Sequence, residues 1–476
     1  MAIKEQPIED AAARVVANEQ VLARQLTARQ LAMIAIGGAI GTGLFLGSGL
    51  SVRVAGPGII ITYLIGAVVA LLLMGALSEM AVAHPTAGSF GVYAEVYLSP
   101  WAGFVARYTY WACQVIAIGG EIIAVAIYCG WWFPKRPDGE PLVPAWVWIV
   151  SFSVALVYVN ARNVGSFGAF EYWFAMIKVV TIVLFIIFGV AVMTGLGGKP
   201  AIGLEHYTAH GGFLPHGWLG VWQAIVFVIF SYIGVEVVAV TAGEAENPQQ
   251  AVPRAMRSMV GRLIIFYVGA IMILVGVVPW TELQGKLESS PFVKVFQLVG
   301  IPAATHIMNF VVLTAALSSI NCNLYLVTRM LFSLSRGGYA PKVFGNVNRR
   351  GTPVNALLAS TGGLALAVWM AKAYKDSAFV YLFGIALFGG LFVWLLIFIT
   401  HLRFRMMWQR EGGRALSVRM PLYPYTSILG ALLVTAILAT TWWVEGMQPA
   451  LLSGVPWLVL LSVAYVMTAT RKSKSS

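Results

Sequence analysis

The sequence predicts an all-α polytopic membrane protein, and two observations support that fold class. Of its 476 residues, 59% are hydrophobic and 11% are charged, and the mean hydropathy is +0.81. Soluble domains carry about 25% charged residues. The second observation is a series of apolar runs of about 20 residues, the length that an α-helix needs to cross a bilayer.

The apolar runs predict twelve transmembrane helices. They lie near residues 31–53, 58–83, 101–131, 145–160, 170–195, 219–242, 259–280, 299–333, 355–373, 377–400, 423–443 and 453–470. The remaining segments are a polar arm over 1–30, a basic loop over 401–422 and a short tail over 471–476, with the last two helices inside 423–470.

The distribution of basic residues predicts the orientation of the chain. With twelve spans both termini share a side, and 22 of the 31 Lys and Arg residues fall on that side, against 8 on the other and one, Lys178, within a span. Basic residues concentrate in cytoplasmic loops, so both termini are expected in the cytoplasm. Because this asymmetry explains the net charge of +12, nucleic acid is not an expected partner.

The cysteines indicate neither a disulfide framework nor a metal site. Cys113, Cys129 and Cys322 lie in or beside apolar segments, without the spacing of a metal-binding motif. We expect no metal and no cofactor.

The first span contains an unusual glycine-rich break. Gly41, Thr42 and Gly43 interrupt a segment that is otherwise apolar from Leu31 to Leu50. Irregular backbone survives at bilayer depth only where it is buried in protein or lines a cavity. A helix broken there would leave amides at a positive dipole end that can hold a carboxylate. The alternative is that these small residues only allow close helix packing.

The sixth span repeats this pattern, with Gly234 and Glu236 in its middle. Spans one and six correspond if residues 31–400 form two groups of five helices, 31–195 and 219–400. Because five is odd, the second group is inverted relative to the first, as in many secondary transporters. Interrupted helices at matching positions of the two halves indicate a substrate site near the bilayer midplane.

Three of the ionisable residues inside predicted helices stand out, namely Lys178, Glu236 and Glu121. A charged side chain near the bilayer centre costs about 2.5–3.5 kcal/mol on insertion scales, so each is a functional candidate, here for proton coupling. The alternative is a static pair that fixes helix packing. If Lys178 faces the break in the first span, its ammonium can bind the freed carbonyls where other transporters place sodium.

Several motifs, in order, resemble the amino acid transporter family of bacterial permeases, within the amino acid–polyamine–organocation superfamily. The resemblance runs from about Gln25 to Arg410. The motifs are the segment 36–45 with its glycines, Ala-Gly-Pro at 55–57, Glu-Tyr-Trp-Phe-Ala-Met-Ile-Lys at 171–178, Phe-Ser-Tyr-Ile-Gly-Val-Glu at 230–236, Gly-Glu-Ala-Glu-Asn-Pro at 243–248 and Asn-Leu-Tyr-Leu-Val-Thr-Arg-Met-Leu at 323–331.

The resemblance implies a five-plus-five inverted-repeat core of the leucine-transporter type with discontinuous helices 1 and 6 and two extra helices. It also implies proton-coupled amino acid uptake by alternating access. The substrate-binding residues that it implies are Ala39, Gly41, Thr42, Gly43, Phe230, Ser231, Ile233 and Gly234.

In this resemblance each group has a role. The amides of Gly41 to Gly43 bind the substrate carboxylate, and carbonyls of both breaks bind its amine. Phe230 matches a gating aromatic ring, Lys178 a lysine used in place of sodium, and Glu236 a carboxylate tied to transport. Glu121 resembles a carboxylate that also occurs in permeases for neutral substrates. Position 38, polar in some superfamily members, is glycine here.

The sequence therefore predicts a secondary transporter of the inner membrane that takes up neutral L-amino acids with protons, and not an enzyme. An amino acid/amine antiporter and a non-transporting amino acid sensor are the alternatives. The partners that we expect are the amino acid substrate, the proton and the lipid bilayer. The last two helices are a candidate contact for a homodimer.

Overall fold

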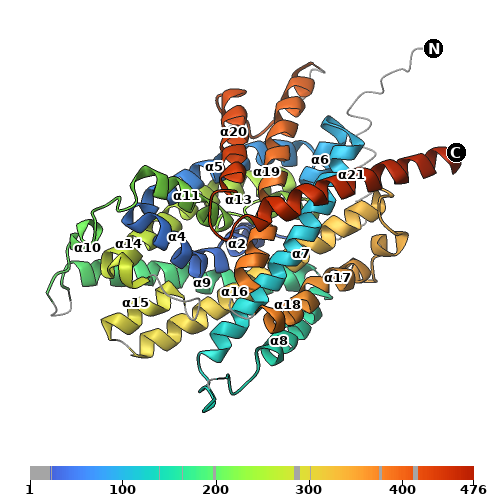
Figure 1. The fold of residues 1–476 in the computed structure, drawn as a ribbon. Helices are drawn as coiled ribbons and strands as arrows, with labels where there is room; N and C mark the ends of the chain where they lie inside the picture. The colour runs from blue at the N-terminus through green and yellow to red at the C-terminus, as the bar shows by residue number, and fades with distance from the viewer. Residues whose placement is uncertain are drawn as a thin grey trace.

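The protein is all-helical in the computed structural model, which describes residues 22, 24–138, 140–162, 164–196, 200–283, 290–300, 302–374, 378–410 and 416–475 (Figure 1). Outside these residues lie most of the predicted arm over 1–30, part of the predicted loop at 411–415 and residue 476 of the tail. Three of the eight basic residues predicted on the side opposite the termini, Lys199, Lys286 and Lys375, also lie outside them. Two isolated backbone bridges, Leu26 with Ala245 and Lys135 with Pro141, are the β-type pairings of the described chain.

The helices follow one another in chain order, with short 3-10 or π turns between some of them. They are α2 (Ala28–Ala39), α3 (Thr42–Phe45), α4 (Gly47–Ala55), α5 (Ile59–Ala83), α6 (Ser89–Tyr97), α7 (Pro100–Gly130), α8 (Ala145–Asn160), α9 (Val164–Met193), α10 (Glu205–Thr208), α11 (Gly217–Phe230), α12 (Val237–Thr241), α13 (Pro248–Leu263), α14 (Gly269–Val277), α15 (Pro291–Val299), α16 (Pro302–Arg336), α17 (Val354–Ser360), α18 (Gly362–Ala373), α19 (Ala378–Arg410), α20 (Tyr425–Thr440) and α21 (Pro449–Ser475). The short turns occupy Gly56–Gly58, Ala242–Glu244, Ile264–Val268, Trp280–Leu283 and Lys342–Gly345.

Eight helical stretches of the described chain are long and apolar enough to cross a membrane, judged by length and composition. Four shorter apolar helices, of 10–17 residues, fall inside the predicted spans at 145–160, 219–242, 259–280 and 423–443. The protein is therefore a multi-pass membrane protein. The number of crossings and the inverted repeat stay predictions.

The first predicted span is interrupted where the glycines predict. A capping box at Thr27 and Gln30 begins α2, which ends at Ala39. Ile40 and Gly41 are extended, and α3 starts again at Thr42. The break leaves the last carbonyls of α2 and the first amides of α3 without partners inside a helix.

The sixth predicted span is also interrupted. α11 ends at Phe230, turns occupy 231–236, and α12 begins at Val237. Gly234 has φ 112°, a conformation that favours glycine. The two breaks touch, because a Cβ on Gly234 would lie 2.4 Å from the carbonyl oxygen of Gly38.

The halves of the two interrupted spans pack crosswise. α2 packs on α12, and α4 packs on α11, so the first half of each span lies beside the second half of the other. The long helices α9 and α16 pack on α2. Helices α7 and α19 reach the second break through Tyr110 and Trp394, which both donate to Glu236. α16 is the most enclosed of them, with 89% of its most apolar window buried, against 17% in α21.

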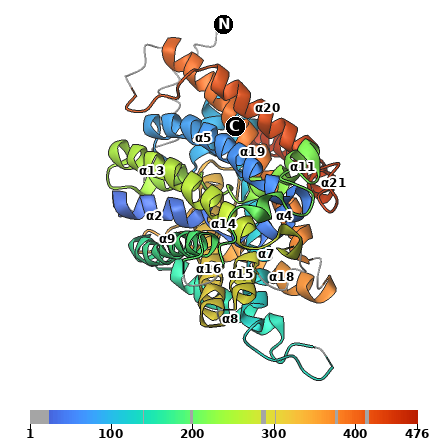
Figure 2. The same ribbon diagram turned by 90° about the vertical axis from the view of Figure 1, so that its left-hand side faces the viewer.

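The two C-terminal helices lie on the outside of the bundle. α20 and α21 are peripheral in both views (Figures 1 and 2). Their outer faces expose large apolar side chains that suit a lipid environment, including Leu432, Leu452, Val459 and Val463.

Helix α19 continues ten residues past the predicted end of the tenth span at 400, through Arg410. His401 and Arg405 lie in this extension and contact Glu79 of α5 at 3.0 and 2.8 Å, and Glu79 also accepts the amide of Met420 at 3.0 Å. The charged residues end the apolar run, but their buried partner keeps the segment helical. α21 likewise runs to Ser475, past the predicted end at 470.

Gly234 gives a direct test of the junction. Gly234→Ala places a Cβ against the Gly38 carbonyl at a strained φ, which costs about 1–3 kcal/mol. We expect a lower melting temperature in detergent, measured by fluorescence-detected size exclusion after heating. Gly362→Ala is the matched control, because nothing lies within 4 Å of a Cβ at that position. Equal melting temperatures would contradict the described junction.

Candidate functional site

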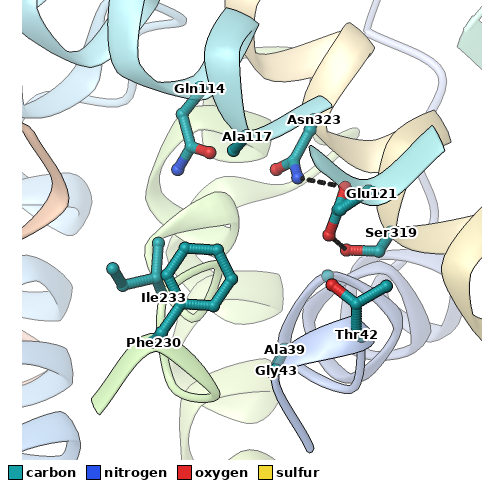
Figure 3. Close-up of a pocket in the computed structure, with 12 residues that line it drawn as sticks. Ala39, Thr42, Gly43, Gln114, Ala117, Glu121, Phe230, Ile233, Ser319 and Asn323 are labelled. Atoms are coloured by element: carbon teal, nitrogen blue, oxygen red, sulfur yellow. Dashed lines mark hydrogen bonds between the residues drawn. The ribbon is translucent and has the colours of Figure 1, made fainter. Parts of the chain in front are cut away.

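A buried cavity lies where the two interrupted spans meet (Figure 3). Its lining comes from the first break, from α7, from the second break and from α16. The lining residues are Gly38, Ala39, Gly41, Thr42, Gly43, Gln114, Ala117, Glu121, Phe230, Ile233, Ser319 and Asn323.

One wall of the cavity is the beginning of α3. The first amides of a helix have no partner inside it and point outward from its N-terminus. The Thr42 hydroxyl beside them is buried and makes no hydrogen bond to the described residues. Gly43 lies so close to the second break that a Cβ there would come within 2.8 Å of the Ser231 Cα. This wall therefore offers donors to a small acceptor.

The carboxylate of Glu121 lies beside this wall, because a Cβ on Gly41 would come within 3.5 Å of it. Glu121 accepts hydrogen bonds from the Ser319 hydroxyl at 2.5 Å and from the Asn323 amide at 3.0 Å, as Figure 3 shows. Ser319 and Asn323 are four residues apart, so they share one face of α16. Both donors are neutral, and Glu121 is the ionisable group of the lining.

The cavity also has an apolar side made by Phe230 and Ile233. The ring of Phe230 lies 4.0 Å from that of Phe383 on α19, centroid to centroid. The Gln114 amide faces the cavity from α7 (Figure 3). The lining therefore combines polar groups with an apolar face, as in sites for small solutes.

Lys178 lies behind the first break and is fully buried. Its ammonium donates to the carbonyl oxygens of Gly37 at 2.6 Å and Ile40 at 2.7 Å. These carbonyls belong to the end of α2, where the helix no longer supplies amide partners. This is the contact expected from the sequence, and its part in coupling stays a proposal.

Glu236 lies behind the second break. It accepts from the Tyr110 hydroxyl at 2.7 Å, the Gly234 amide at 3.0 Å and the Trp394 indole at 3.3 Å. The carboxylate thus holds the turn at Gly234 against α7 and α19. It does not line the cavity.

Tyr267 joins the two breaks. Its hydroxyl lies 2.5 Å from the Ala39 carbonyl oxygen and 2.7 Å from the Ser231 carbonyl oxygen. Its ring packs against Tyr63 and Tyr232, with centroids 6.1 and 4.8 Å away. Because the Tyr267 ring is held by other aromatic rings while its hydroxyl contacts both breaks, Tyr267 fixes the spacing of the two backbones.

The structure brings most of the predicted site together. The predicted residues that line the cavity are Ala39, Gly41, Thr42, Gly43, Phe230, Ile233 and Glu121, while Ser231, Gly234, Lys178 and Glu236 form a layer behind it. The sequence reasoning missed Gln114, Ala117, Ser319, Asn323 and Tyr267. A usable signal existed on α7, where 114, 117 and 121 follow the spacing of one helix face.

Metal chemistry has no candidate in the described part of the chain. It contains no group of three His, Cys, Asp or Glu side chains that could hold an ion. Its cysteines are free and buried.

A cavity between two interrupted helices of a multi-pass membrane protein is the arrangement of a small-molecule transporter. The family model of amino acid permeases matches residues 30–474, and the chain belongs to that family. Members of this family are transporters and not enzymes.

Characterised and named relatives agree with this placement. The γ-aminobutyric acid permease of Bacillus subtilis (strain 168) is 39% identical over 96% of this chain and 95% of its own. A putative histidine permease of the same organism is 39% identical over 94% of both chains. The aromatic amino acid transport protein AroP of Escherichia coli O6:H1 is 38% identical over 94% of this chain and 95% of its own.

Proposed function

We propose that the protein is a symporter that imports neutral L-amino acids together with protons across the cytoplasmic membrane by alternating access. The observation that carries this proposal is that the first break has two polar sides, one toward the cavity and one toward Lys178. The first break presents the α3 amides to the cavity on one side and the carbonyls of Gly37 and Ile40 to Lys178 on the other.

The amino acid backbone binds at the two breaks. Its carboxylate accepts from the amides of Gly41, Thr42 and Gly43, and the Thr42 hydroxyl adds a fourth donor. Its ammonium donates to carbonyls of Ala39 and of residues 230, 231 and 233. The Tyr267 hydroxyl shares two of these carbonyls, and a carbonyl oxygen has two lone pairs, so both contacts are compatible.

The side-chain end of the cavity favours a neutral substrate. Gln114, Ala117, Ile233 and Asn323 carry no charge, and Glu121 is already held by two donors. Gly38 lets the first break approach Val237 and Gly234 of the second. Phe230, packed against Phe383, is the gating ring above the bound substrate.

Proton coupling is assigned to Lys178, Glu236 and Glu121. A proton on Lys178 holds α2 to α9 through two carbonyls. Loss of that proton weakens the contact and frees α9 to move relative to the break. Glu236 links the movement of α9 to the second break, and Glu121 links it to the cavity lining.

The cytoplasmic exit is closed by a buried ion pair. Arg329 of α16 donates to both oxygens of Glu244 at 2.8 and 3.2 Å, and Tyr325 donates to the same carboxylate at 2.7 Å. The amides of Gln25 and Leu26 bond the Glu244 carbonyl, each at 3.1 Å, which ties the start of the chain to this gate. Opening toward the cytoplasm requires these contacts to separate.

The architecture proposed for this cycle has twelve transmembrane helices, with 31–195 and 219–400 as inverted repeats. Both termini lie in the cytoplasm, as the basic residues indicate. Helices α20 and α21 face lipid or a second copy of the chain.

Uptake by proteoliposomes tests the function. An inward proton gradient should drive accumulation of at least one compound from a panel of the protein L-amino acids, their D-isomers and γ-aminobutyrate. No accumulation of any compound would refute the proposal. A requirement for substrate inside the vesicle would identify an antiporter, and saturable binding without uptake would identify a sensor.

Gly41→Val tests the carboxylate site. A Cβ at position 41 would lie 2.6 Å from the Ser319 hydroxyl, so a branched side chain fills the space in front of the α3 amides. We expect substrate affinity to fall about tenfold or more, since an ion and its charge-assisted hydrogen bonds are displaced. Scintillation proximity binding with the labelled substrate measures this. Wild-type affinity would show that the carboxylate binds elsewhere.

A further inference from the structure

Glu171 is a fully buried carboxylate outside the cavity lining. It lies on α9, seven residues before Lys178, so the two Cα atoms are about 10 Å apart along the helix axis and the side chains share nearly the same face. With the proposed orientation, Glu171 is the nearer of the two to the cytoplasm.

A chain of buried polar side chains leads from Glu171 toward the surface. Glu171 accepts hydrogen bonds from Ser318 and, at 3.2 Å, from the amide of Asn321, both on α16. The Asn321 oxygen accepts at 2.7 Å from the amide of Asn160, the last residue of α8. Arg162, two residues later, is exposed.

The other end of this chain reaches Lys178 through Gly37. A Cβ at position 37 would lie 2.1 Å from a Glu171 oxygen, so only glycine fits between the carboxylate and α2. The carbonyl of the same Gly37 accepts from Lys178 at 2.6 Å. Glu171 and Lys178 therefore both contact Gly37, close to the first break.

The partners of Glu171 differ from those of two other buried carboxylates. Glu79 and Glu244 each contact an arginine, which holds a carboxylate in its ionised form. The hydrogen bonds of Glu171 come from neutral groups. Such a carboxylate can carry a proton or release it without breaking an ion pair.

We propose that Glu171 is a second proton-binding site, through which the proton on Lys178 leaves for the cytoplasm. A water molecule between the two side chains takes a proton from the Lys178 ammonium and gives one to the Glu171 carboxylate, which leaves a neutral amine and a neutral acid. The acid then gives the proton to water that enters between α8 and α16 at Asn160. Asn321 positions the carboxylate for this step.

Other ionisable groups that face this pair enter its pH response. Of the described residues, these are Cys322 of α16 and Glu121 of α7. The remaining partners on α2, α8 and α16 are backbone or neutral polar groups. Glu171 and Lys178 are thus the pair nearest to the proposed exit.

The test compares two transport modes in proteoliposomes that contain the full chain. The probe is the first of ¹⁴C-labelled L-threonine, L-phenylalanine, L-histidine and γ-aminobutyrate that the wild type accumulates. Glu171→Gln should lower proton-driven accumulation about tenfold or more, the scale of a lost proton-transfer group, and leave counterflow exchange at equal pH near wild type. Glu171→Asp should restore part of the accumulation.

Two further variants keep the proposal falsifiable. Glu246→Gln makes the same chemical change at an exposed site and should behave as wild type. Asn321→Ala keeps the carboxylate but removes a donor to it, and should shift the pH dependence of accumulation while exchange continues.

The inference rests on the proposed function, and the outcomes separate the two. If the wild type accumulates no probe, the proposed function fails. If the wild type accumulates the probe and Glu171→Gln does so equally, or loses exchange and accumulation alike, only the role of Glu171 is overturned.

Discussion

The structure depends on the contact between the Lys178 ammonium and the carbonyls of Gly37 and Ile40. A helix that stops inside a membrane leaves carbonyls without partners, and each one costs free energy unless a donor replaces the missing amide. Lys178 supplies two such donors from a neighbouring helix. The interrupted helix is therefore stabilised by α9, and in the proposed coupling this contact makes the position of α9 sensitive to a proton.

The same break explains why a solute site forms here. The carbonyl end of α2 faces Lys178, and the amide end of α3 faces the cavity, so the two ends of one interruption serve two ligands. Tyr267 and the Gly38–Gly234 contact tie the second break to the first. In the proposed cycle, a change in the protonation of Lys178 is transmitted to backbone groups within one or two residues of the proposed substrate site.

The sequence predicted the helix breaks because glycines and a threonine are conspicuous inside an apolar run, and it predicted Lys178 because a lysine in a span is costly. It did not predict the partners of Glu171, or that Gln114 and Asn323 line the cavity. Those facts depend on how α7 and α16 are rotated in the bundle, and their polar residues indicate an inward face without showing which neighbouring helix it meets. Arg329 was equally hidden, since an arginine near the end of a span has the pattern of a solvated residue although it is buried against Glu244.

Transport by Lys178→Ala tests the central claim most directly, because it removes the proton-sensitive contact and leaves the cavity lining intact. Proteoliposomes should lose accumulation driven by a proton gradient while counterflow exchange continues. An equal loss of both activities would show that Lys178 only supports the fold, and undiminished accumulation would show that the proton is carried elsewhere.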